Sequence, residues 1–121
     1  MVNGVLFLES PKCSTCQKAK RWLDERGVAY TDRSIVEDNP TADELRTWHE
    51  RSGLPLKRFF NTSGMLYREM ELSKKLPTMS EAEQYELLAT NGMLVKRPLL
   101  VTAATAIPGF KEAAWKEALG R

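Results

Sequence analysis

The first third of the chain combines a buried-strand pattern with a helical one. The apolar run Val5-Leu6-Phe7-Leu8 is short and continuous, as in a buried β-strand. Ser14 and Gln17 match the S-x-x-Q capping box, so a helix is predicted to begin near Ser14 and to end before Gly27. Residues 28–35 mix β-branched and aromatic residues with polar ones, which predicts a second strand. The inward stripe of the helix is Ala19, Trp22 and Leu23.

The middle of the chain carries two further helical signals around a less regular stretch. The first signal is a capping box at Thr41 and Glu44, which predicts a helix that ends at Gly53. The second is a capping box at Ser80 and Glu83, which predicts a helix that ends at Gly92. Between them we expect buried aromatic residues at Phe59 and Phe60, a turn at 61–64 and one short helix over 67–72. The inward positions predicted for the two capped helices are Leu45, Trp48, Tyr85, Leu88 and Ala89.

The C-terminal third returns to strand patterns. Residues 99–102 predict a strand, and residues 105–107 its hairpin partner. Gly109 precedes a last predicted helix, which would turn Trp115 and Leu119 inward. The predicted order is therefore βαβ, then three or so helices, then ββα.

This order predicts the fold class and the domain organisation. Strands near both ends with helices between them indicate an α/β fold that carries a helical insertion at about residues 41–92. A chain of 121 residues suits one domain, so we expect a single domain over 1–121.

Composition and charge narrow the functional classes. The formal net charge of +2 is too small to indicate a nucleic-acid surface, so no direct DNA binding is expected. No apolar run approaches the roughly 18 residues that span a bilayer, and the N-terminus lacks a secretory signal pattern. The chain has only two cysteines, which make no disulfide framework and favour a reducing, cytoplasmic location.

Those two cysteines form the motif Cys13-Ser14-Thr15-Cys16 at the predicted strand-to-helix junction. Such a pair indicates thiol–disulfide chemistry, in which the thiolate is the nucleophile. The helix N-terminus, Lys12 and Arg97 would each favour a thiolate. We predict that Cys13, just before the helix, is the nucleophile, and that Cys16, in the first turn, resolves the mixed disulfide.

Other interpretations of these residues stay open. The cysteines could be inert core residues or half of a zinc site. Structural zinc takes four protein ligands, and the only histidine, His49, lies on a distant predicted helix, so no metal or other cofactor is expected. His49 is interpreted as a surface helix residue. Arg97 could equally make a surface ion pair, and Pro98 is expected at the mouth of a strand.

Two stretches carry a resemblance to a known family. Residues 7–16, Phe-Leu-Glu-Ser-Pro-Lys-Cys-Ser-Thr-Cys, and the later Arg97-Pro98 before a strand resemble the arsenate reductase (ArsC)/Spx family, in its ArsC-related branch. The resemblance implies a thioredoxin-like fold with a helical insertion. It also implies that Cys13 is the redox cysteine, that Pro98 is cis beside it, and that Arg97 holds the thiolate or an oxyanion substrate. Lys12, Ser14, Thr15, Asn61 and Pro98 are the predicted substrate-binding residues.

The chain departs from the arsenate reductases of this family at named positions. Those enzymes carry one cysteine in this loop and surround arsenate with three arginines. Here only Arg97 matches clearly, because Asn61 stands at the apparent place of the second, near Lys57 and Arg58. The place of the third falls near residues 110–111, which are Phe and Lys. An arsenate pocket short of two arginines would lose much of its charge complementarity.

The sequence therefore supports two hypotheses from different classes. The first is a thiol–disulfide oxidoreductase related to arsenate reductases, regenerated by glutathione, glutaredoxin or thioredoxin. The second is an Spx-like redox-sensing regulator that binds the C-terminal domain of the RNA polymerase α subunit. Gly53 falls near a glycine that matters for that contact in the family, although a glycine there also serves as a helix stop.

Overall fold

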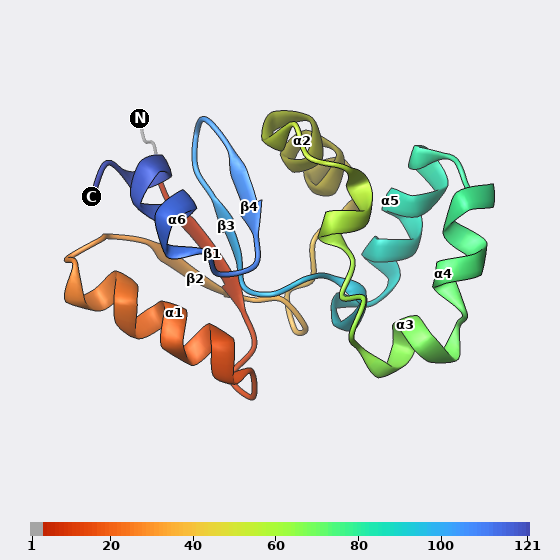
Figure 1. The fold of residues 1–121 in the computed structure, drawn as a ribbon, viewed down its shortest axis with the longest axis horizontal. Coiled ribbons are helices and arrows are strands. Elements are labelled where there is room, and N and C mark those ends of the chain that lie inside the picture. Colours follow the sequence, from red (N-terminus) through yellow and green to blue (C-terminus); the bar gives the residue numbers. More distant parts are fainter. Residues whose placement is uncertain (1–3) are drawn as a thin grey trace.

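The computed structural model describes residues 4–121, whose strands form one mixed sheet in the order β2-β1-β3-β4 (Figure 1). The central strand β1 is parallel to β2 and antiparallel to β3, which is in turn antiparallel to β4. The strands are β1 (Leu6–Glu9), β2 (Thr31–Ser34), β3 (Leu99–Val101) and β4 (Ala106–Pro108). The predicted strands are confirmed, with β2 shorter than the pattern of 28–35 suggested.

Six α-helices and three short 3-10 helices (η) accompany the sheet in the described part of the chain. Figure 1 shows α1 and α6 together beside the strands, and α3, α4 and α5 grouped on the opposite side of the molecule. The α-helices are α1 (Ser14–Glu25), α2 (Ala42–Ser52), α3 (Met65–Glu69), α4 (Leu72–Lys75), α5 (Glu81–Thr90) and α6 (Glu112–Leu119). The 3-10 helices are η1 (Leu56–Phe59), η2 (Leu76–Thr78) and η3 (Gly92–Leu94).

The alternation of side chains along β1 divides the core between the two faces of the sheet. Successive strand residues point to opposite faces. Phe7 packs in one cluster with Leu23 of α1 and Trp115 of α6. Leu8 packs in the other cluster, with the helices that follow β2. The sheet is therefore covered on both faces. The loop that carries the cysteines follows directly after the inner strand β1.

Most of the helix signals are confirmed. The capping boxes at Thr41 and Ser80 are formed as predicted, and Gly27 and Gly53 adopt the left-handed conformation after α1 and α2. Phe59 and Phe60 are buried. The local signals of caps and glycine stops thus mark the ends of these helices correctly.

Two predictions in the helical part are corrected by the structure. The single helix expected over 67–72 is two helices, α3 and α4, because Glu71 between them has a positive φ of 52°. Gly92 does not stop α5, which is followed by Asn91, but begins η3. A Cβ atom on Gly92 would lie 1.8 Å from the carbonyl oxygen of Ile35, so glycine is needed there for close approach of two backbone segments.

Candidate thiol active site

Cys13 is the N-cap residue of α1. Its Sγ accepts a hydrogen bond from the backbone N–H of Cys16 at 3.1 Å, and its own N–H donates to the Ser10 carbonyl. The predicted cap was Ser14, which is wrong by one position: Ser14 is exposed and is the first residue of the helix. Gln17 does not complete a capping box but donates to the Pro11 carbonyl at 2.7 Å. The sulfur of Cys13 therefore occupies the anion-favouring position at the helix N-terminus.

Cys16 occupies a different environment, although it lies only one helical turn away. Its side chain is fully buried, whereas Cys13 is half-buried, and neither is in a disulfide. Burial, together with a hydrogen bond to Cys13, raises the pKa of the Cys16 thiol to about 12. The two thiols are thus unequal in access to solvent, as the sequence predicted from their positions.

Arg97 approaches the cysteines from the segment before β3. One of its terminal nitrogens, Nη2, donates to the carbonyl oxygens of Gly92, Met93 and Val95 at 3.2, 2.7 and 3.1 Å. Its Nε is buried and has no hydrogen-bond partner in the described part of the chain. Burial lowers the pKa of Arg97, while the charges on Cys13 and Cys16 oppose that shift. The Arg97–Pro98 peptide bond is cis, and Pro98 is buried at the start of β3.

A cavity of about 770 Å³ gives solvent access to the Cys13 sulfur. We call it the thiol cavity. Met93 and Val36 are exposed apolar residues in its lining. The charged residues in the lining are Glu9, Lys12, Glu37 and Arg97. The cavity combines a cysteine with apolar surface and charged side chains, which is the mixture typical of small-molecule binding sites.

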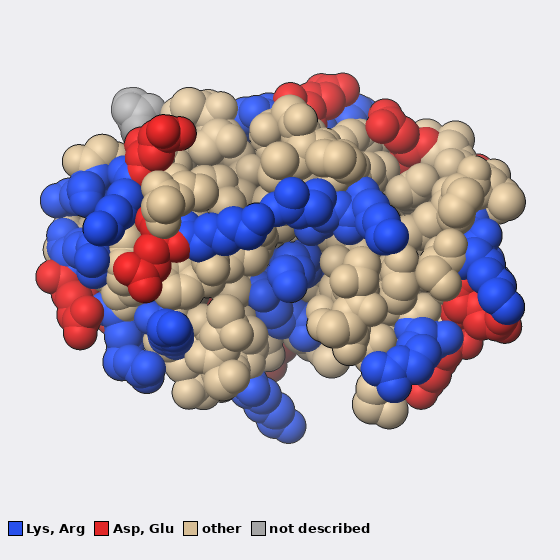
Figure 2. Space-filling model, in the orientation of Figure 1, with Lys and Arg blue, Asp and Glu red and all other residues tan. Residues whose placement is uncertain are grey.

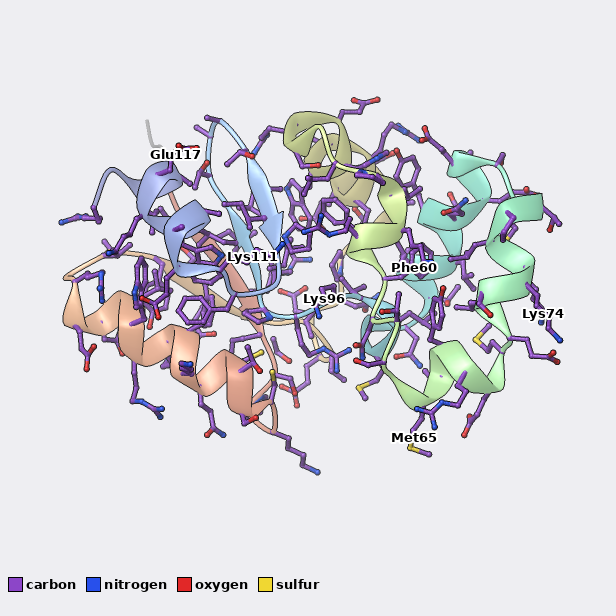
Figure 3. All side chains as sticks on the ribbon, in the orientation of Figure 1. Phe60, Met65, Lys74, Lys96, Lys111 and Glu117 are labelled. Carbon is purple, nitrogen blue, oxygen red and sulfur yellow. The ribbon has the colours of Figure 1, made fainter. Side chains whose placement is uncertain are left out.

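A second hollow, which we call the cationic hollow, shares Arg97 with the thiol cavity. It has a volume of about 340 Å³, and Thr15 at the start of α1 contributes to its lining. Its basic residues are Arg58, Lys96, Arg97 and Lys111. Figure 2 shows Lys and Arg side chains gathered across the middle of this face, and Figure 3 shows Lys96 and Lys111 near one another there. An anionic group would be attracted to this position.

The structure brings two of the five predicted substrate-binding residues to these two cavities, and the buried Pro98 is among the three that line neither. Lys12 lines the thiol cavity and Thr15 the cationic hollow, whereas Ser14 lines neither. Asn61 also lies outside both linings: it begins a turn that the Gly64 N–H closes on its carbonyl, and its Nδ2 donates to the Met93 carbonyl at 3.4 Å. Lys96 was not among the residues predicted from the sequence, although the basic pair Lys96-Arg97 was a usable signal.

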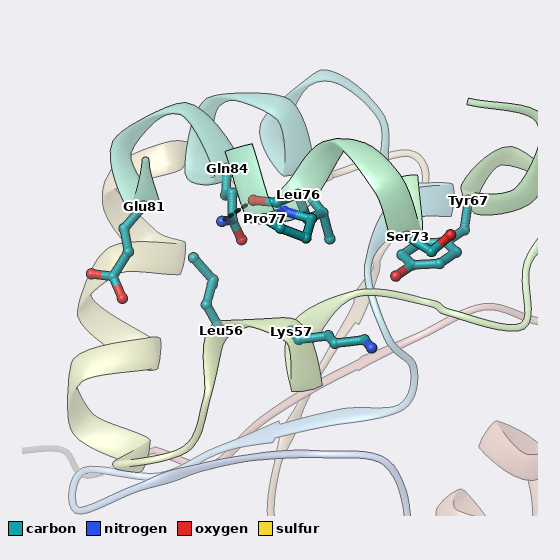
Figure 4. A pocket seen from close by; sticks show the side chains of 8 residues that line it. All are labelled: Leu56, Lys57, Tyr67, Ser73, Leu76, Pro77, Glu81 and Gln84. Atoms are coloured by element: carbon teal, nitrogen blue, oxygen red, sulfur yellow. Dashed lines mark hydrogen bonds between the residues drawn. The ribbon is translucent and has the colours of Figure 1, made fainter. Parts of the chain in front are cut away.

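Other features lie away from the thiols. A cavity of about 300 Å³ among η1, α3, η2 and α5 is lined by residues that include Tyr67 and Gln84 but neither cysteine (Figure 4). His49 is half-buried rather than on the open surface, with its Nδ1 2.6 Å from the Tyr85 hydroxyl, so it joins α2 to α5. Within residues 4–121, no helix has the length and apolar character needed to cross a membrane.

Comparison with known proteins identifies the family. The model of the ArsC family matches residues 8–118. The chain belongs to the ArsC family. It is 53% identical to the uncharacterized protein YusI of Bacillus subtilis, over 94% of this chain and 97% of that one. It is also 60% identical to a structure described as ArsC-family-related from Bacteroides fragilis, with a TM-score of 0.91 over 93% and 95% of the two chains.

A regulator is among the relatives of this ArsC-family chain. The global transcriptional regulator Spx of Staphylococcus aureus is 25% identical over 89% of this chain and 81% of its own. The fold is the thioredoxin-like fold of the ArsC family, as the resemblance implied. These findings support a thiol redox protein or an Spx-like regulator.

The contribution of Arg97 to thiol reactivity can be measured directly. In the Arg97→Met variant we expect alkylation of Cys13 by iodoacetamide at neutral pH to slow by about fivefold, equivalent to about 1 kcal/mol of lost charge–charge interaction. Arg58→Met is the matched control, because Arg58 lines the cationic hollow but not the thiol cavity. Equal alkylation rates in the two variants would show that the Arg97 charge does not act on Cys13.

Proposed function

We propose that this ArsC-family chain is a thiol–disulfide oxidoreductase that uses Cys13 as nucleophile and Cys16 as resolving thiol. The observation that carries the proposal is the placement of the Cys13 sulfur at the N-cap of α1, with the buried Cys16 thiol one turn behind it. A cap position favours a thiolate, and partial exposure lets a substrate reach it.

The reaction proceeds in two exchange steps. The Cys13 thiolate attacks one sulfur of a substrate disulfide, so that a Cys13–substrate mixed disulfide forms and the first substrate thiolate leaves. Cys16 then loses its proton and attacks the Cys13 sulfur, which releases the second substrate thiolate and forms the Cys13–Cys16 disulfide. Two electrons pass from the cysteine pair to the substrate. A thiol reductant, such as glutathione, glutaredoxin or thioredoxin, returns the pair to two thiols.

The charges near Cys13 favour a substrate with anionic groups. Arg97 lies in the linings of both the thiol cavity and the cationic hollow, so a ligand bonded to Cys13 can place a negative group among the basic residues beside it. Glutathione, with its two carboxylates, has this chemistry. Arsenate is a weaker candidate, because Lys96 and Lys111 offer point charges rather than the bidentate donors of arginine.

The test is to find where the reaction stops when Cys16 is removed. We expect reduced wild-type protein treated with glutathione disulfide to lose two hydrogens and retain no adduct, as judged by intact-protein mass spectrometry. The Cys16→Ser variant is expected to accumulate one glutathione on Cys13. A wild-type protein that forms no Cys13–Cys16 disulfide under these conditions would contradict the resolving role.

The similarity to Spx favours a second candidate, a redox-sensing regulator that binds the RNA polymerase α C-terminal domain. In that case the same cysteine pair acts as a switch without turnover. Binding of the purified α C-terminal domain in one redox state only would support it. Multiple turnovers of glutathione disulfide, with no such binding in either redox state, would favour the enzyme.

A further inference from the structure

In the resolving step the Cys16 thiol must lose its proton. Cys16 must become a thiolate to attack the mixed disulfide, yet its burial and its hydrogen bond to Cys13 raise the pKa of its thiol to about 12. Very little of such a thiol is ionised at neutral pH. Within the proposed function, a nearby group must therefore accept this proton for resolution to be fast.

The register of the sheet places a carboxyl group beside this thiol. Glu9 is the last residue of β1 and lies two positions after Phe7, so the two side chains share the face of the sheet that α1 covers. Asp32 on β2 stands opposite Phe7 in the parallel register and so belongs to the same face. Lys20 of α1 reaches this face and donates to Asp32. Glu9 and Asp32 thus lie on the sheet face that α1 covers, and Lys20 reaches them from α1, the helix that begins between the two cysteines.

Two contacts link Glu9 to the reacting thiols. The carbonyl of the residue after it, Ser10, accepts a hydrogen bond from the Cys13 N–H at 3.1 Å, and the Ser10 backbone is among the groups that lower the pKa of Cys16. The Glu9 side chain also lines the thiol cavity together with Cys13. Its charge acts on Cys16, where it is one of the causes that disfavour the thiolate. Protonation of Glu9 would therefore favour ionisation of Cys16.

We propose that Glu9 accepts the proton of Cys16 in the resolving step, held in place by the Asp32–Lys20 pair. This inference rests on the proposed function. The proton moves from Cys16 Sγ to a Glu9 carboxylate oxygen, as Cys16 attacks Cys13 and the substrate thiolate leaves. Glu9, which lines the thiol cavity, then returns the proton to solvent or to the departing thiolate, so no further reactant is needed.

The other charged groups around the site are less suited to this task. Burial, followed by a hydrogen bond and charge repulsion from Asp32, raises the pKa of Glu9 to about 7, where a base works best at neutral pH. Burial alone would raise the pKa of Asp32, but its hydrogen bonds with Glu9 and Lys20 hold it below its ordinary value. The remaining charged groups of the thiol cavity are Lys12, Glu37 and Arg97, of which only Glu37 is a carboxylate, and it is exposed.

The two exchange steps can be followed separately with dipyridyl disulfide, which releases one absorbing thiopyridone at each step. We expect Glu9→Gln to slow the second release by about tenfold or more at neutral pH and to leave the first within about twofold. The wild-type second phase should rise with pH through an inflection near 7, and the variant should lack that inflection. Glu25→Gln, which makes the same change at an exposed position of α1 outside both the thiol cavity and the cationic hollow, should behave like wild type.

Melting temperatures show whether the variant is slow for a structural reason. Because the pKa of Glu9 is raised from 4.5 to about 7 in the folded protein, stability from its protonated form is present below pH 4.5 and is lost as pH rises through 7. The amide introduced by Glu9→Gln does not ionise, so this variant should lose less stability than wild type across this range. A variant that is slow in the second phase but keeps its melting temperature fails in proton transfer, not in folding.

The outcomes separate this inference from the proposed function. If Cys16→Ser still shows a second release, Cys16 does not resolve the mixed disulfide and the proposed function fails. If Cys16→Ser loses the second release while Glu9→Gln keeps the wild-type rate and inflection, the function stands and the role of Glu9 is overturned.

Discussion

The Cys13→Ser variant is expected to lose all reaction with disulfides above the uncatalysed background, while its fold is preserved. A serine hydroxyl is not ionised at neutral pH and cannot form the mixed disulfide. The structural role of Cys13 is different, since its side chain accepts a hydrogen bond from the Cys16 N–H as the N-cap of α1. Serine is among the best N-cap residues, so its oxygen can take over that bond. Chemistry and helix capping are therefore separated by this one substitution.

The measurement is the release of thiopyridone from dipyridyl disulfide, with a thermal melt of the same sample. We expect no release by Cys13→Ser and a melting temperature equal to or above that of wild type. Cys16→Ala serves as the comparison, because it should keep the first release and lose the second. If Cys13→Ser still reacted at the wild-type rate through Cys16, the assignment of the two thiols would have to be reversed.

The positions of the two thiols relative to helix α1 could be predicted from sequence, because they depend on local signals. A strand, a proline turn and a helix start within a few residues fix which cysteine precedes the helix and which lies inside it. The choice of cap was wrong by one residue because the S-x-x-Q pattern considers only hydroxyl caps, whereas the Cys13 sulfur accepts the bond here. The sequence pattern thus predicted where in the chain the site lies. Only the structure shows that the Cys13 sulfur accepts the capping hydrogen bond from the Cys16 N–H.

The surroundings of the thiols depend on pairs far apart in the chain, and there the sequence was less informative. Arg58 and Lys111 meet Arg97 at one hollow only because η1 and the segment before α6 return to the start of β3. The resemblance to the arsenate reductases led instead to Asn61, at the apparent place of their second arginine, but Asn61 lies in a turn outside both cavities. Glu9 could have been found from the strand period alone, since it follows Phe7 by two positions on the face that α1 covers.

The position of the Arg97 side chain also depends on contacts between segments far apart in the chain. Its three carbonyl partners belong to η3 and the residue after it, and η3 in turn packs its first residue, Gly92, against the end of β2. The position of the charge beside Cys13 is therefore set by a backbone contact between Gly92 and Ile35. Neither residue takes part in the proposed chemistry, yet a change in their packing should alter it.

The Gly92→Ala variant is accordingly expected to lose about 3 kcal/mol of unfolding free energy, near the upper end for overpacking. Its Cβ would stand 1.8 Å from the Ile35 carbonyl oxygen and 2.7 Å from the carbonyl carbon, which are backbone atoms that cannot rotate away. Either η3 or the end of β2 must move. Because the Gly92 carbonyl is one of the acceptors of Arg97, a shift of η3 would also displace the guanidinium.

Urea unfolding measures the first effect, and alkylation of Cys13 by iodoacetamide in the folded protein measures the second. Gly4→Ala is the matched control, since a Cβ atom there meets nothing within 4 Å and its stability should change by less than about 0.5 kcal/mol. If Gly92→Ala were as stable as Gly4→Ala, the contact with Ile35 would be looser than the structure has it. If it were destabilised but reacted at the wild-type rate, Arg97 would hold its place without η3. Loss of both stability and reactivity would show that one glycine, remote from the thiols in sequence, sets the charge beside them.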